Sequence, residues 1–283
     1  MNKIFIFSIG VSCLLLNLIS CNDDLPTSDM QMDCQSQLET KSLVASNDTI
    51  LKDCKFIYQG EIYEYISTVV NDSVVDIDNK SVKKLFCEFE NYSNLVTHMY
   101  RDGLVEIFKD SETFHTELTR VLEKEKVLME NEIIPYKADV PWNTVPPIDR
   151  SENKMANLYL CDDESYEDTY HQFDLTPGNS PLEIAKLKDY GLNDKTTSFA
   201  AYTIGGTTLF ELFEDSNFKD HCITFIVYTG SATEISGDIV YKWGVPTKQV
   251  GQLLVADLKD LWVKGHKVDT WNDRISSIRI TRL

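Results

Sequence analysis

Trp271-Asn272-Asp273-Arg274-Ile275-Ser276-Ser277-Ile278-Arg279-Ile280, close to the end of this chain, repeats the form of Leu192-Asn193-Asp194-Lys195-Thr196-Thr197-Ser198-Phe199. Both stretches contain Asn-Asp-x-x-Ser/Thr-Ser, and both continue directly into apolar residues typical of a strand. A single hexapeptide of this form is typical of an Asx-turn in which Ser or Thr caps the start of a strand. Two copies inside a longer repeat indicate a duplicated fold with the same side chains at equivalent points.

The longer repeat lies within residues 157–283. The stretch from Leu158 to Asp168 matches the stretch from Phe210 to Asp220. Leu160 aligns with Leu212, Asp162 with Glu214, Asp163 with Asp215, and Tyr166 with Phe218. In each copy a strand-like segment follows, and a Leu-Lys-Asp step precedes the hexapeptide. Two copies of about four short strands predict two Greek keys that share one core.

This pattern resembles the βγ-crystallin family, in which such hexapeptides are calcium-binding clamps. The resemblance implies an all-β, double Greek-key β-sandwich over residues 157–283. It also implies two Ca²⁺ sites to which both clamps contribute, because calcium takes six to eight oxygen ligands and one hexapeptide cannot supply them. The implied side-chain ligands are Asp194, Thr197, Asp273 and Ser276, and the implied carbonyl ligands are Lys195, Arg274 and the turn residues Asp162 and Glu214.

The chain departs from the family pattern at several points, and in the first copy Cys161 replaces the leading aromatic residue. Asp168 and Asp220 stand where the family has a glycine, and Asp tolerates the left-handed backbone there better than most residues. An insertion at 230–252, which includes Trp243, interrupts the second copy. Some βγ-crystallin-like domains are peptidase inhibitors, so an inhibitor that uses this insertion is an alternative to a calcium-stabilised binding or structural protein.

The N-terminus reads as a leader. Residues 1–20 contain Lys3 and then an apolar stretch that is too short for a good membrane-spanning helix. The stretch ends in Leu-Ile-Ser-Cys, which resembles the lipobox of bacterial lipoproteins, so Cys21 is the expected lipidation site; an ordinary secretory leader is the alternative. Asn22-Asp23-Asp24 resembles the surface-export signal of Bacteroidetes lipoproteins. The expected location is the outer membrane, lipid-anchored and exposed at the cell surface, with a periplasm-facing anchor as the alternative.

Three further segments precede the repeat. Residues 21–50 are polar and predict a flexible tether. Residues 51–130 predict a small α+β domain of unknown role, with hairpins around Gln59-Gly60 and Asp102-Gly103 and helices over about 81–92 and 111–129. Residues 131–156 hold four prolines and predict an extended linker. His98 and His115 have no acidic or histidine partner at ligand spacing, so both are expected to be ordinary structural or surface residues.

The amino-acid composition of the chain favours some classes of function over others. The formal net charge of −18 disfavours nucleic acid and favours a cation as partner, although acidity for solubility explains the same number. Five cysteines remain beyond Cys21, an odd number, so at least one free thiol is expected. No common catalytic motif occurs, and an enzyme is not expected. The expected partners are calcium, the membrane through the lipid anchor, and an unidentified surface protein or glycan.

Overall fold

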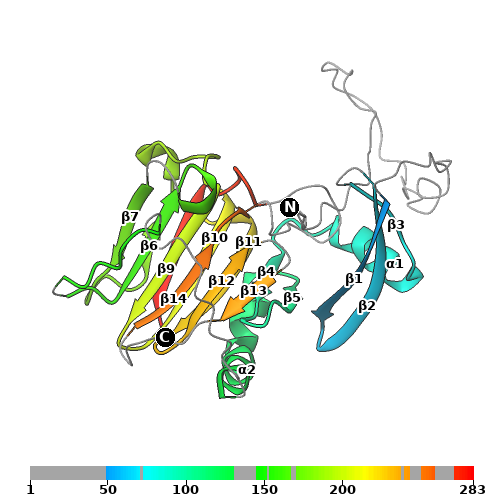
Figure 1. Cartoon of the computed structure of the whole chain (residues 1–283), viewed down its shortest axis with the longest axis horizontal. Coiled ribbons are helices and arrows are strands. Elements are labelled where there is room, and N and C mark those ends of the chain that lie inside the picture. The colour runs from blue at the N-terminus through cyan, green and yellow to red at the C-terminus, as the bar shows by residue number, and fades with distance from the viewer. Residues whose placement is uncertain are drawn as a thin grey trace, which may run out of the picture.

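The computed structural model describes residues 49–70, 73–130, 145–151, 153–166, 170–236, 239–242, 250–258 and 271–283 (Figure 1). Within these ranges the protein is mostly β-sheet, with two α-helices. The expected leader, Cys21 and nearly all of the expected tether lie outside the described residues. No helix of the described part is both long enough and apolar enough to cross a membrane.

The N-terminal elements match the sequence expectations closely. They are β1 (Thr49–Tyr58), β2 (Glu61–Val70), β3 (Ser73–Ile77), α1 (Lys80–Phe89), β4 (Val96–Met99), β5 (Val105–Phe108) and α2 (Ser111–Glu130). Both predicted hairpins are confirmed, β1 with β2 and β4 with β5. Helix α1 begins where the Asn79 side chain accepts hydrogen bonds from the amides of Ser81 and Val82, which is standard N-cap chemistry.

Ten strands follow in the C-terminal part. They are β6 (Ala156–Cys161), β7 (Tyr170–Leu175), β8 (Leu182–Ile184), β9 (Ser198–Ile204), β10 (Thr207–Asp215), β11 (Lys219–Tyr228), β12 (Ala232–Ser236), β13 (Ile239–Lys242), β14 (Val250–Val255) and β15 (Ser277–Arg282). Two short 3₁₀ turns, η1 (Glu164–Tyr166) and η2 (Leu187–Tyr190), lie in the first repeat. Both hexapeptides lead directly into strands, β9 and β15, as the sequence predicts.

The strands form two sheets whose composition mixes the two repeats. One sheet has the order β3-β2-β1-β5-β4-β11-β10-β15-β8, and the other has the order β13-β12-β14-β9-β6-β7. Strand β8 of the first repeat therefore lies with the second-repeat strands, and β14 of the second repeat lies with the first-repeat strands. Leu158, Phe199, Phe210, Phe225 and Trp271 meet in one core between these sheets, so the two repeats are interlocked.

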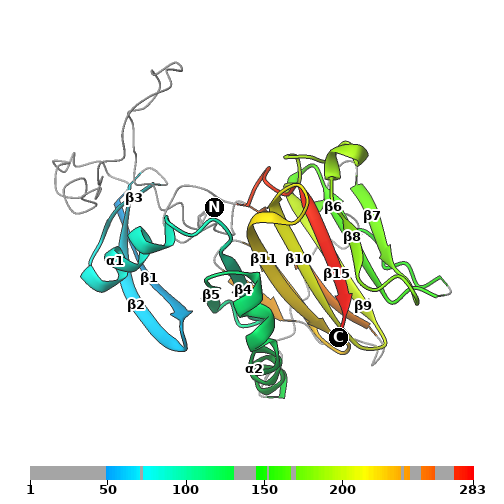
Figure 2. The ribbon, with the colours of Figure 1, turned by 180° about the vertical axis from the view of Figure 1, so that it is seen from behind.

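The nine-stranded sheet continues across the expected domain boundary. Strand β4 pairs in parallel with β11, with Val96 opposite Cys222, and Figures 1 and 2 show β4 and β5 beside the sandwich. Helix α1 covers one face of the N-terminal strands, where Phe86 and Phe89 pack on Phe56. The other face carries a cluster with side chains from both halves: Ile57, Val96, Tyr100, Phe108, Phe114, Val121, Leu209, Phe213, Cys222 and Ile226. The division at 51–130 and 157–283 stays a prediction, and the sheet has no break there.

A row of polar residues crosses the face that carries this mixed cluster. In register across six strands, β5, β4, β11, β10, β15 and β8, lie Glu106, His98, Thr224, Glu211, Arg279 and Glu183. Helix α2 adds partners from above: Arg120 contacts Glu106 at 2.7 Å, Glu125 contacts His98 at 3.3 Å, and His115 contacts Glu211 at 3.5 Å. Ionic contacts therefore hold α2 to the sheet beside the apolar ones.

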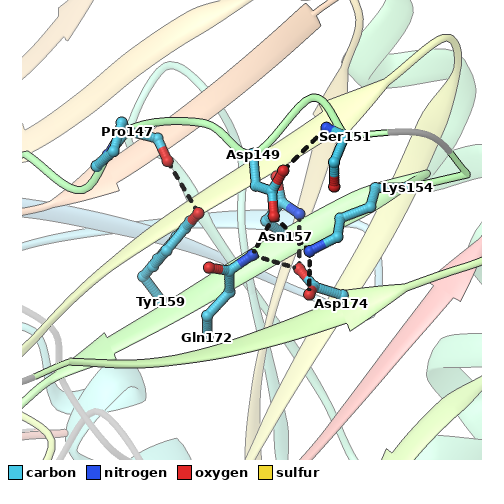
Figure 3. A network of polar contacts seen from close by, with 8 residues as sticks. All are labelled: Pro147, Asp149, Ser151, Lys154, Asn157, Tyr159, Gln172 and Asp174. Carbon is cyan, nitrogen blue, oxygen red and sulfur yellow. Dashed lines mark hydrogen bonds and ion pairs between the residues drawn. The ribbon is translucent and has the colours of Figure 1, made fainter.

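Residues 145–151, here named the strap, lie on the outer face of the six-stranded sheet. The hydroxyl of Tyr159 donates to the Pro147 carbonyl at 2.8 Å, and Lys154 joins Asp149 to Asp174 of β7 (Figure 3). The Lys154 ammonium holds the pKa of Asp149 below its ordinary value. The described end of the expected 131–156 linker is thus docked on the sheet, and residues 131–144 lie outside the described part.

Candidate functional site

The two clamps, residues 193–198 and 272–277, adopt the same backbone conformation. Asp194 and Asp273 have φ values of 52° and 55°, in the left-handed region that Asp enters more readily than most residues. In each clamp the amide of the fifth residue donates to the strand end of its own repeat: Thr197 to the Cys161 carbonyl and Ser276 to the Phe213 carbonyl, both at 2.9 Å. The sequence repeat is therefore a structural repeat at atomic detail.

The last serine of each clamp fixes the neighbouring turn, a role that the sequence reading missed. Ser198 donates to the Asp163 carbonyl at 2.6 Å and accepts from the Tyr166 amide at 3.2 Å. Ser277 makes the equivalent pair, donating to the Asp215 carbonyl at 2.6 Å and accepting from the Phe218 amide at 3.0 Å. The sequence feature that could have indicated this role is the serine at the sixth position of both hexapeptides.

The carboxylate of each clamp meets the hydroxyl of the other. The Thr197 hydroxyl donates to Asp273 Oδ1 at 3.4 Å, and the Ser276 hydroxyl donates to Asp194 Oδ1 at 3.1 Å. The asparagine that precedes each aspartate donates to its second oxygen, at 2.7 Å for Asn272. Oxygen atoms from clamps almost eighty residues apart in the chain are thus gathered in two crossed pairs.

The two turn residues lie beside these pairs. In the first turn, the residues on either side of Asp162 are Cys161 and Asp163, and their carbonyls accept hydrogen bonds from the first clamp. In the second turn, the residues on either side of Glu214 are Phe213 and Asp215, and their carbonyls accept hydrogen bonds from the second clamp. The structure thus brings Thr197 to Asp273 and Ser276 to Asp194. The family resemblance implies that Asp162 and Lys195 belong with the first pair, here called the first site, and that Glu214 and Arg274 belong with the second pair, here called the second site.

The second site contains an ion pair and is open to solvent. At the second site the Arg274 guanidinium makes an ion pair with Glu214, and both side chains are partly exposed. An open, mainly polar hollow surrounds this site, and its lining includes Asp194, Glu214, Asp215, Asp273, Arg274 and Ser276. A cation therefore has direct access from solvent to the second site.

Glu214, Asp220 and His221 form another group with the residue types of a metal site. The Leu95 amide donates to His221 Nδ1 at 3.2 Å, so the ring proton is on Nε2, which lies 3.1 Å from Asp220 Oδ1. A metal at Nε2 needs the lone pair of that nitrogen, and the Leu95 amide holds the opposite tautomer. His221 is a structural residue in this arrangement.

Two buried thiols of the described part are not suited to nucleophilic catalysis. Cys161 and Cys222 form no disulfide, whereas Cys87 is disulfide-bonded, so the expectation of at least one free thiol is confirmed. Burial raises the pKa of Cys161 to about 12 and that of Cys222 well above its ordinary value. Both thiols therefore stay protonated at neutral pH.

The insertion is only partly described. Residues 232–236 and 239–242 form β12 and β13; β12 lies parallel to β14, and β13 is the edge strand of the six-stranded sheet. Trp243 and the rest of 243–249, on which the inhibitor alternative depends, lie outside the described residues, as does the lipidation site Cys21.

Comparison with protein-family models, with curated proteins and with solved structures found no match for this chain.

Proposed function

We propose that residues 157–283 are a βγ-crystallin-like double Greek-key sandwich that binds two calcium ions, carried by a lipoprotein anchored through Cys21 at the cell surface. The observation that carries this proposal is the crossed pairing of Thr197 with Asp273 and of Ser276 with Asp194. Crossed clamps are what the family resemblance implies, and a simple pair of Asx-turns gives no reason for them.

The strand order supports the same fold. Counting four strands per repeat, β6 to β9 and then β10, β11, β14 and β15, the third strand of each repeat lies in the sheet of the other repeat. Two Greek keys that exchange their third strands share one core, which accounts for the single cluster of Leu158, Phe210 and Trp271. The left-handed φ of Asp220, 60°, fits its place at the family's glycine position.

The donor set favours calcium among common metal ions. Each site offers a carboxylate, a hydroxyl and two main-chain carbonyls, with water able to complete six to eight ligands. Zinc prefers nitrogen and sulfur ligands in a tetrahedral arrangement, and magnesium requires near-ideal octahedral geometry. Sites formed from two turns, with oxygen ligands only, suit the larger and less demanding Ca²⁺.

Calcium would join the two repeats, because each site takes ligands from both clamps. Without it, the hydroxyl of each crossed pair donates to the carboxylate, and on binding both oxygens turn to the ion. Binding to the folded state alone stabilises it by about 2.7 kcal/mol per site at a hundredfold excess over Kd. We propose a binding or structural role rather than catalysis, with a surface protein or a glycan as the partner.

Calorimetric titration of calcium into residues 22–283 tests this function. Two saturable binding events are expected for the wild type, and none for Asp194→Ala/Asp273→Ala. Glu112→Ala/Glu123→Ala, which removes the same charge from two exposed positions of α2, is the matched control and should bind like the wild type. A folded wild type that takes up no calcium at millimolar concentration would contradict the proposal.

A further inference from the structure

The turn between β10 and β11, residues 214–221, belongs to the second calcium site and to the joint with the N-terminal half at the same time. On its calcium side, Glu214 pairs with Arg274 of the second clamp. Ser277 holds Asp215 and Phe218 through hydrogen bonds of 2.6 Å and 3.0 Å. The conformation of this turn is therefore fixed by the clamp that forms the second site.

On its other side the same turn is bonded to the start of β4. The amide of Leu95 donates to Nδ1 of His221 at 3.2 Å, and its carbonyl accepts from the Cys222 amide at 2.9 Å. His221 is only 3% exposed, and its Nε2 lies 3.1 Å from Asp220. One imidazole thus connects the turn to the residue at which the N-terminal half joins the sheet.

Phe218 extends the connection to α2. Its ring packs edge-to-face on Phe213 at 5.6 Å, and Phe213 is part of the cluster that contains Phe114 and Val121 of α2. Arg279 lies over the Phe218 ring at 4.7 Å and also contacts Glu211 of the polar row at 3.7 Å. A shift of the turn would therefore disturb both the apolar and the ionic contacts beneath α2.

The turn of the first site, residues 162–166, packs against the strap instead. This turn has the equivalent hydrogen bonds to Ser198, but its aromatic residue, Tyr166, packs in a cluster with Val145 and Ile148 of the strap. The two sites have similar ligands, but their turns therefore pack against different parts of the protein.

We propose that calcium at the second site and docking of the segment 95–128 onto β11 are coupled through this turn, each strengthening the other, whereas the first site is not coupled in this way. The inference rests on the proposed function. Coupling between two binding events is reciprocal, and typical couplings change affinity by roughly 5- to 150-fold. The N-terminal half would thereby respond to the calcium concentration outside the cell.

Hydrogen exchange at the amides of Leu95 and of β4 tests the coupling in the full chain. Calcium should slow exchange there in the wild type and in Asp273→Ala, which loses a ligand of the first site. It should have no such effect in Asp194→Ala, which loses a ligand of the second site. Equal responses of the two variants, or unchanged exchange in a wild type that binds two ions, would overturn the coupling and leave the proposed function standing. A wild type without calcium binding would refute the proposed function itself.

The reciprocal measurement is calcium affinity in variants of His221. His221→Leu removes both contacts of the imidazole and should weaken one of the two binding events by at least about fivefold, the lower end of typical couplings. His221→Asn keeps an acceptor for the Leu95 amide and should recover part of that loss. Unchanged affinity at both sites in folded His221→Leu would overturn the coupling.

Discussion

The crossed clamps predict which pairs of substitutions remove the same calcium ion. Asp194→Ala and Ser276→Ala alter the second site, and Asp273→Ala and Thr197→Val alter the first. A double variant of Asp194 and Ser276 should therefore keep one site. A double variant of Asp194 and Thr197, two residues of the same clamp, should lose both.

The size of the effect follows from mass action and from the hydrogen-bond lengths. One site at a hundredfold calcium excess contributes about 2.7 kcal/mol, which for a domain of this size corresponds to a midpoint shift of about 5–11 °C. The hydroxyl–carboxylate hydrogen bonds, at 3.1 Å and 3.4 Å, are long. Their loss without calcium should cost no more than about 1 kcal/mol of unfolding free energy. The calcium-dependent loss of stability can therefore be distinguished from the loss of these hydrogen bonds.

Thermal unfolding in chelator and in excess calcium measures the calcium-dependent shift of the midpoint directly. The cross-clamp double variant should retain about half of the wild-type calcium shift, and the within-clamp double variant should retain none. The opposite pattern, with the within-clamp double keeping half, would mean that each clamp forms its own site and would refute the crossed geometry.

Three further predictions concern charged side chains. Arg274→Gln removes a positive charge beside the second site and should raise its calcium affinity about fivefold, since one charge near a divalent ion in a water-rich setting is worth on the order of 1 kcal/mol; titration calorimetry that finds weaker binding would show that the Arg274–Glu214 pair is needed to hold the turn. Glu125→Gln removes the buried carboxylate that faces both Arg101, at 3.5 Å, and His98, at 3.3 Å, and should cost about 3–5 kcal/mol of unfolding free energy in urea, whereas an unchanged midpoint would contradict this. Burial raises the pKa of Glu211 above its ordinary 4.5, so the wild type should be most stable relative to Glu211→Gln below pH 4.5 and should lose that advantage as pH rises through the folded-state pKa; a relative gain with rising pH would mean that Arg279 and His115 outweigh burial.

Short stretches of sequence were sufficient to predict the helices and strands and to locate the two clamps. The Gln59-Gly60 and Asp102-Gly103 turns and the apolar period of α1 lie within short stretches of chain, so their signals are readable without a partner. The two Asn-Asp-x-x-Ser/Thr-Ser copies are equally local, and the structure gives both the same left-handed aspartate.

The partners of buried polar residues could not be predicted from short stretches of sequence. His98 showed no acidic neighbour at ligand spacing, yet it lies against Glu125 of α2 and Thr224 of β11. The row from Glu106 to Glu183 exists only because six strands pair in one register. A shift of one residue in any strand would turn its member to the opposite face.

The sequence by itself thus determined which segments form strands and helices and where the two repeated Asn-Asp turns lie, because backbone preference and side-chain period act over a few residues. Only the tertiary structure decided that Thr197 meets Asp273, that β8 and β14 exchange sheets, and that β4 extends the sandwich at β11. Those arrangements depend on strand register and on the burial of one shared core, which join residues up to about 130 positions apart and leave no pattern in any single stretch of chain.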